Sequence, residues 1–171
     1  MDKILSTEDL KRLMAEAKEQ GHFLVNLNGA HFSDIDLRMQ EVPVSLDLDD
    51  AIIDGNVDLS MANFAGSYIS LDRAEIGGFL SLNGMEVTNR EGRPEGIGLF
   101  LRGALVHGTT QLQDTKLNTL CVYAADFAGG GLFDDVPGLF RLQGTRINRL
   151  FVYPRDGEEE EFQRPAKASA V

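Results

Sequence analysis

Three pairs of carboxylates are the residues whose type and spacing could support catalysis. They are Asp47 with Asp49, Asp49 with Asp50, and Asp134 with Asp135. A glycosidase or lyase needs two acids at a defined separation in a groove, where one donates and the other accepts a proton. Such sites also tend to use aromatic platforms, and the chain has no Trp and three Tyr. The pairs alone therefore do not predict an enzyme.

Other chemical motifs are missing or isolated. His22, His31 and His107 stand alone, and no Cys or His pair has the spacing of zinc ligands. The sequence contains no nucleophile elbow, metalloprotease histidine pair, phosphate-binding loop or dinucleotide fingerprint. The glycine triplet at 129–131 is followed by acids and not by a helical pattern, so it predicts a corner. We expect no catalytic residue, no metal site and no cofactor.

The elements that would position any site are set by a short repeat. An apolar marker recurs every five or six residues from Leu27 to Val152, and a small or apolar residue often stands two positions earlier. Because side chains alternate along a strand, both residues of each pair would face inward. A repeat of short strands predicts a solenoid. The markers are Leu27, Phe32, Leu37, Val42, Leu48, Ile53, Leu59, Phe64, Leu71, Ile76, Leu82, Val87, Leu101, Val106, Leu112, Leu117, Val122, Phe127, Leu132, Leu142, Ile147 and Val152.

Two segments carry this repeat best, LNGAHFSDIDL (27–37) and VDLSMANFAGSYISL (57–71). They resemble pentapeptide-repeat proteins, and the resemblance extends over residues 24–153. It implies an all-β fold, a right-handed quadrilateral β-helix (solenoid) in which four short strands make one square coil. With four markers in each coil, residues 24–153 would form about five to six coils.

The two ends of the chain differ from the repeat. Residues 7–20 predict a helix, with Ser6 or Thr7 as the N-cap and Gly21 as the stop. A narrow apolar stripe along one face must dock, and the open end of the solenoid is the nearest partner. We therefore predict a capping α-helix in residues 1–23 and a mobile acidic tail in residues 154–171. The stripe consists of Leu10, Leu13, Met14 and Ala17.

The formal net charge of −11 is unevenly distributed. Residues 24–90 hold eleven acids and three bases, a net charge of −8, which disfavours direct binding of nucleic acid. The sequence contains no stretch of eighteen apolar residues, so it predicts no membrane span. The single cysteine, Cys121, and an N-terminus without the apolar core of a secretory signal favour a cytoplasmic location.

These features predict a non-enzymatic scaffold that binds a protein partner of unknown identity, as a monomer or a homodimer. Two segments interrupt the repeat, residues 88–98 and 128–138, and both contain Gly and Pro. Arginine and aromatic residues contribute much of the binding energy of protein interfaces. The interruptions are predicted to be loops or distorted strands that carry the contact residues Arg90, Arg93, Phe133, Asp134 and Asp135.

A sixth candidate contact lies on a regular strand. By alternation Phe100 should point outward, on the same side of the solenoid as Cys121 and about one coil away from it. Exposed apolar side chains of this kind are typical of binding patches.

The resemblance also implies an alternative, since one branch of the family mimics DNA and modulates type II topoisomerases. The acidic half has a net charge density near that of duplex DNA, about one charge per 1.8 Å. However, the acids are predicted on all four sides of the solenoid, whereas a mimic needs stripes. The predicted pairs are Asp47 and Asp72, Asp54 and Glu75, Asp36 and Asp58, and Glu41 and Glu86.

Overall fold

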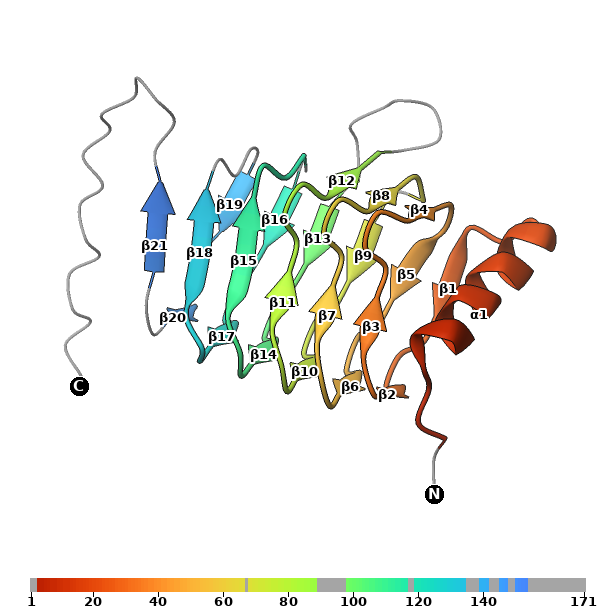
Figure 1. Cartoon of the computed structure of the whole chain (residues 1–171), viewed down its shortest axis with the longest axis horizontal. Coiled ribbons are helices and arrows are strands. Elements are labelled where there is room, and N and C mark those ends of the chain that lie inside the picture. The colour runs from red at the N-terminus through yellow and green to blue at the C-terminus, as the bar shows by residue number, and fades with distance from the viewer. Residues whose placement is uncertain are drawn as a thin grey trace.

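The chain folds into a β-solenoid with one α-helix at its N-terminal end (Figure 1). The computed structural model describes residues 3–66, 68–88, 98–116, 119–134, 139–141, 145–147 and 150–153. All strand pairs within these ranges are parallel, and each joins strands from successive coils. The predicted mostly-β solenoid is confirmed.

Four sheets run along the stack. Sheet I contains β1 (Leu24–Asn26), β5 (Ser45–Asp47), β9 (Tyr68–Ser70), β13 (Gly98–Phe100), β16 (Thr119–Cys121) and β19 (Leu139–Arg141). Sheet II contains β2 (His31–Phe32), β6 (Ile52–Ile53), β10 (Glu75–Ile76), β14 (Leu105–Val106), β17 (Asp126–Phe127) and β20 (Arg146–Ile147). Sheet III contains β3 (Ile35–Asp36), β7 (Val57–Asp58), β11 (Leu80–Ser81), β15 (Thr110–Gln113), β18 (Gly131–Asp134) and β21 (Leu150–Tyr153). Sheet IV contains β4 (Glu41–Val42), β8 (Asn63–Phe64) and β12 (Glu86–Val87).

The core is built from in-register ladders of apolar side chains. In sheet II, Phe32, Ile53 and Ile76 are Cα partners and are buried, and the ladder continues through later coils. Burial of such side chains supplies the main favourable term in folding. The predicted inward register is confirmed over most of the stack. The markers Leu59, Phe64, Leu71, Ile76, Leu82 and Leu112 are all fully buried.

The register prediction is wrong at one strand. Residues 131–134 form β18, where Leu132 pairs with the outward Gln111 and Phe133 pairs with the buried Leu112. Leu132 is accordingly only half-buried, although it was predicted as an inward marker. The error arises because Gly131 occupies the first inward position of the strand and leaves no apolar signal there.

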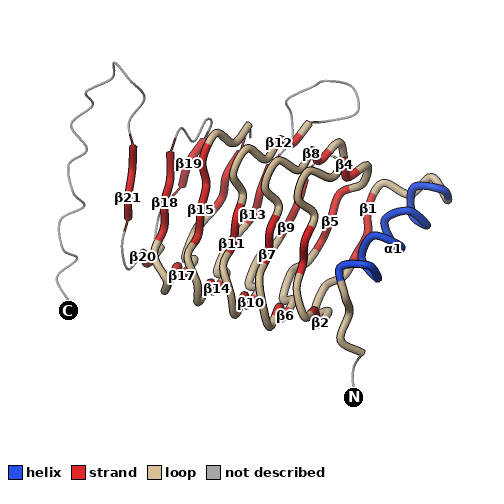
Figure 2. The backbone as a smooth tube through the Cα atoms, viewed as in Figure 1, coloured by secondary structure: helices blue, strands red, loops and turns tan. Residues whose placement is uncertain are grey.

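Corners between the strands have two distinct solutions, which are visible as tan segments in Figure 2. The corners that follow sheets I and III place one residue in the left-handed region, such as Met39 with φ 57° and Gly84 with φ 65°. The corner between sheets II and III instead stacks glycine on glycine. A Cβ at Gly129 would lie 2.2 Å from the carbonyl carbon of Gly108, so no side chain fits there. This confirms that the glycine triplet at 129–131 contributes to a corner.

The helix α1 (Thr7–Glu19) lies beside β1 at the end of the stack (Figure 1). Ser6, one of the two predicted candidates, is its N-cap, and it forms a capping box with Asp9. Gly21, with φ 74°, follows the last turn. The buried side chains of its apolar face join the core, and Leu13 is partly buried against it. The buried ones are Leu10, Met14 and Ala17.

Backbone groups at the first coil are paired by the segment that leads into the helix. Leu5 forms a β-bridge with Phe32, in which its amide donates to the His31 carbonyl at 2.7 Å. The Thr7 hydroxyl accepts from the Asp36 amide at 2.9 Å and donates to the Asp34 carbonyl at 3.1 Å. These contacts occupy edge groups of sheets II and III that would otherwise lack a strand partner.

Candidate interaction surface

Most acids of the first three coils hold the backbone of the stack. Asp36, Asp47 and Asp58 each accept a hydrogen bond from the amide two residues ahead, which forms an Asx turn after the strand. The Asp49 carboxylate reaches the next coil, where the Asp72 amide donates to it at 3.2 Å and the Ser70 hydroxyl at 2.5 Å. Acids that the sequence suggests are only surface charges therefore stabilise turns and join neighbouring coils.

Asp72 is the clearest case, and it corrects the prediction that this acid lies on the surface. Its side chain is fully buried, and it accepts from the Arg102 amide at 2.7 Å and from Arg102 Nε at 2.6 Å. The Asp72 carboxylate raises the pKa of Arg102. Asp72 and Arg102 lie in successive coils, so their ion pair links these two coils. The pairing also stabilises the carboxylate, because a buried charge without a partner is costly.

Two further arginines pair with acids at the corners. Arg73 donates from Nε and one terminal nitrogen to the two oxygens of Asp50, both at 2.7 Å, and this lowers the pKa of Asp50. Arg38 binds Asp36 in the same bidentate way, lowers its pKa, and lies 3.5 Å from Asp58. The remaining acids are distributed over different sheets: Asp47 on sheet I, Asp54 and Glu75 on sheet II, Asp58 on sheet III, and Glu41 and Glu86 on sheet IV.

Phe100 occupies the outward position predicted for it, and its Cα partner in the next coil is Cys121. Its ring is half-buried, because it meets the Tyr68 ring edge-on at 6.3 Å and the Arg102 guanidinium lies 5.8 Å from its centre. Burial and nearby acids raise the pKa of Tyr68. Much of the Phe100 surface is therefore engaged by its own chain.

The other predicted contact residues are not brought together by the described structure. Arg90, Arg93 and Asp135 lie outside the described residues. Phe133 and Asp134 lie in strand β18, so of the two alternatives predicted for 128–138, a loop or a distorted strand, this part forms a strand. The spacing of six from Phe127 to Phe133 equals that from Val106 to Leu112, a signal that could have predicted this strand.

Two exposed methionines, Met39 and Met61, are the surface feature that the sequence analysis missed. Their exposed fractions are 79% and 62%, the largest among the bulky apolar residues of the described chain. Both occupy the left-handed corner after sheet III, with φ of 57° and 58°. Apart from Gly130, every left-handed residue of the described solenoid follows an inward marker by two positions, as Met39 follows Leu37, so the repeat itself contains the signal.

The histidines pair singly with carboxylates of the neighbouring coil. His31 Nε2 lies 2.9 Å from Asp54, and His107 Nε2 lies 3.0 Å from Glu75. Both pairs lie along sheet II, with His31 and Glu75 in its strands and Asp54 and His107 directly after its strands. His22 is exposed and follows the C-terminal end of α1. Among the described residues no three His, Cys, Asp or Glu side chains come close enough to hold a metal ion.

No family model, curated protein or solved structure matches this chain. The resemblance to pentapeptide-repeat proteins stays a prediction. Among the helices of the described chain, none has the length and apolar character that a membrane span requires.

Proposed function

We propose that this protein is a non-enzymatic scaffold that binds a protein partner on the outside of its solenoid. The proposal rests on a difference between side chains on that surface: most acids of the first three coils are engaged by hydrogen bonds and ion pairs within the chain, whereas some large apolar side chains are exposed to solvent. In the two carboxylate pairs whose side chains the structure describes, the acids are engaged: Asp47 by the Asp49 amide, Asp49 by Ser70 and the Asp72 amide, and Asp50 by Arg73. Large apolar side chains such as Met39 and Met61 stand exposed on a stack with a continuous buried core. Rigid supports with exposed apolar groups favour recognition.

The same contacts weigh against charge mimicry, the alternative that the family resemblance implies. Arg38, Arg73 and Arg102 each pair with acids in the first three coils. Arg102 lies outside residues 24–90, so it adds one positive charge to the net charge of −8 counted there, and the paired acids do not form free charges. The remaining acids are spread over different sheets. A surface that replaces duplex DNA needs a regular row of unpaired charges on one side.

A capture experiment with matched variants tests the scaffold against the mimic. The full chain is immobilised, exposed to extract of its native host, crosslinked, and the bound protein is identified and quantified. The double variant Asp47→Asn, Asp49→Asn removes two charges but keeps the side-chain oxygens that accept hydrogen bonds from the amides of residues 49 and 72. A scaffold retains its partner in this variant, and the wild type leaves supercoiling by a type II topoisomerase unchanged.

Two outcomes would overturn the proposal. Loss of the partner on charge removal, together with inhibition of the topoisomerase by the wild type, would assign charge mimicry. Failure to crosslink any protein in stoichiometric amount would remove the scaffold role altogether.

A further inference from the structure

The corner residues of the solenoid form two columns of left-handed residues, one after sheet I and one after sheet III. The column after sheet III consists of Met39, Met61, Gly84 and Asp114. Backbone hydrogen bonds link each methionine to the next coil. The Met39 amide donates to the Ser60 carbonyl at 2.9 Å, and the Met61 amide donates to the Asn83 carbonyl at 2.7 Å. The two methionines therefore occupy equivalent places in successive coils, roughly 4.8 Å apart.

The column after sheet I shows what the fold itself requires at such a corner. It contains Gly29, Gly103 and Ala124, which are small, and Asp50 and Arg73, which form a bidentate ion pair with each other. Glycine adopts a positive φ without strain, and each non-glycine residue there has a cost. Methionine has neither a small side chain nor an ion-pair partner, so the stack does not account for it at this position.

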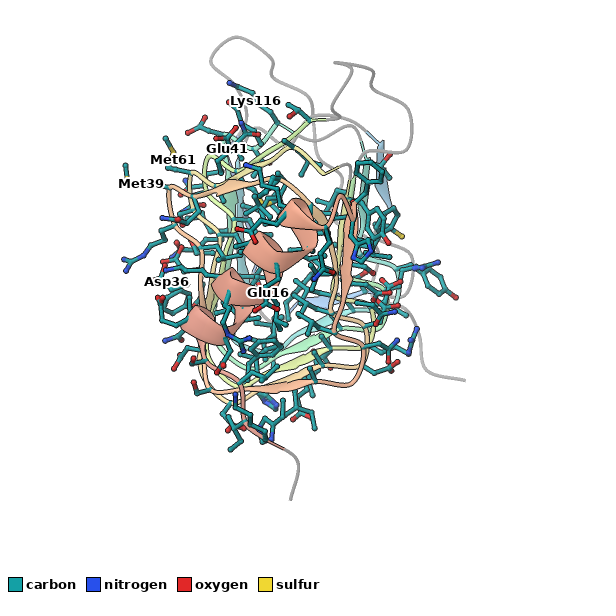
Figure 3. The ribbon with its side chains drawn as sticks, turned by 90° about the vertical axis from the view of Figure 1, so that its right-hand side faces the viewer. Glu16, Asp36, Met39, Glu41, Met61 and Lys116 are labelled. Carbon is teal, nitrogen blue, oxygen red and sulfur yellow. The ribbon has the colours of Figure 1, made fainter. Side chains whose placement is uncertain are left out.

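The two methionines form an exposed apolar ridge, which we name the Met39–Met61 ridge. The Met61 sulfur packs over Gly84, since a Cβ at that position would lie only 2.3 Å from it. The thioether thus lies across the corner of the next coil. Figure 3 shows Met39, Met61 and Glu41 on the same side of the stack, with both methionines directed outward. Thioether side chains adapt their shape to different apolar partners.

Acids border the ridge on both sides. Asp36 and Asp58 lie on sheet III, and Glu41 and Glu86 lie on sheet IV. Arg38 pairs with the first two acids and Lys116 pairs with Glu86. Lys11 of the helix also lies close enough to Asp36 to interact with its charge, so four acids face three bases. The border remains net negative, and no hydrogen bond or ion pair joins Glu41 to another described residue. The surroundings of the ridge are complementary to a cation.

We infer that the Met39–Met61 ridge binds a short segment of a protein partner that carries both apolar and cationic side chains. The apolar side chains would pack on the two thioethers, and a Lys or Arg would meet Glu41 at the border. This inference rests on the proposed scaffold function and assigns its contact surface and the chemistry of its partner. Apolar contact excludes water, while the charges set orientation and the rate of association.

The substitution that tests the ridge is Met39→Gly with Met61→Gly, because glycine is the residue that a positive φ favours. Removal of both side chains should therefore leave the melting temperature unchanged or higher. Ala124→Gly is the matched control, since it makes the same backbone change in the other column. The probe is a synthetic amphipathic peptide of Leu and Lys, and two comparison peptides replace its Leu by Gln or its Lys by Glu.

Fluorescence anisotropy should show binding of the Leu–Lys peptide to the wild type and to Ala124→Gly. The double glycine variant, and either comparison peptide on the wild type, should bind about tenfold more weakly, as for truncation of interface anchors. In NMR spectra with ¹³C-methyl methionine, the signals of Met39 and Met61 should shift on binding. Those of Met14 and Met85, which are buried, should not.

Equal binding of the peptide by the double glycine variant and the wild type would overturn the inference, as would equal binding of the Leu–Lys and Gln–Lys peptides. No binding by the wild type would do the same. Capture of the native partner distinguishes failure of the ridge from failure of the scaffold function. If the double glycine variant captures the partner as well as the wild type does, the ridge is not the contact surface, but the scaffold function still holds.

Discussion

The Thr7 hydroxyl offers the sharpest test of how the first coil is held. Thr7→Val keeps the shape of the side chain but removes the atom that accepts from the Asp36 amide and donates to the Asp34 carbonyl. An unsatisfied buried amide costs about 1–3 kcal/mol, and this site is only partly buried, which favours the lower end. Loss of the donated bond adds roughly 0.5–1 kcal/mol. We expect a decrease of about 2 kcal/mol in the free energy of unfolding.

Urea unfolding followed by circular dichroism would measure this change, and a loss of 2 kcal/mol corresponds to a lower melting temperature by roughly 4–8 °C. Thr7→Ser is the control, because it keeps the hydroxyl and should stay within about 0.5 kcal/mol of the wild type. Hydrogen exchange gives a local readout, since only the valine variant should lose protection at the Asp36 amide. If the two variants have the same stability and the same Asp36 exchange rate, the hydroxyl does not hold the edge.

Deletion of residues 1–22 extends the same reasoning to the whole segment. It removes the bridge at Leu5, the hydroxyl of Thr7 and the apolar face of α1 in one step. The exposed edges of sheets II and III would then invite pairing with another chain. Analytical ultracentrifugation should detect dimers or larger aggregates. A truncated protein that remains monomeric and as stable as the full chain would show that the helix does not act as a cap.

Three further predictions follow from burial and charge. Leu82→Ala removes a fully buried side chain and should lower the free energy of unfolding by ~2–5 kcal/mol in urea titration, while a change below 1 kcal/mol would contradict the ladder core. Dilute peroxide followed by mass spectrometry should oxidise Met39 and Met61 first, before the buried Met14 and Met85. The lowered pKa of Asp50 means that its pairing with Arg73 stabilises the fold above about pH 4 and is lost as the pH falls through the lowered pKa. Arg73→Gln should therefore destabilise the protein at about pH 7, and this effect should shrink as the pH falls below about 4; an effect that does not change with pH would contradict the pairing.

The inward ladders could be predicted from the sequence because they rest on strict local rules. Alternation places Leu80 of β11 and Leu82, directly after the strand, on the inward face, and the register between coils follows from stacking like positions. The same rule fails at β18, where Gly131 gives no apolar signal and the marker shifts by one residue to Leu132. The helix α1 was predictable for a similar reason, since its N-cap Ser6 and its apolar stripe are both local features.

The role of the acids could not be predicted, because it depends on contacts about one coil apart. Asp72 and Arg102 are 30 residues apart in the sequence, and only the stack brings the carboxylate beneath the guanidinium. A count of charges along the chain treats both as surface groups. The same limit applies to Met39 and Met61, whose importance depends on their being equivalent corners of neighbouring coils.

Recognition on a solenoid of this kind is therefore expected at its corners more than on its flat sheets. Strand residues are constrained by neighbours in adjacent coils, as Ser81 is by a hydrogen bond of 2.7 Å to Ser60 and Phe100 is by Tyr68. A left-handed corner carries its side chain away from both flanking sheets, so its identity is limited only by the cost of the backbone conformation. Where that cost is met by glycine or by an ion pair, the corner serves the stack. At the two exposed methionines only Met61 packs on the next corner, at Gly84, and most of both side chains stays exposed, so contact with a partner is the gain that remains.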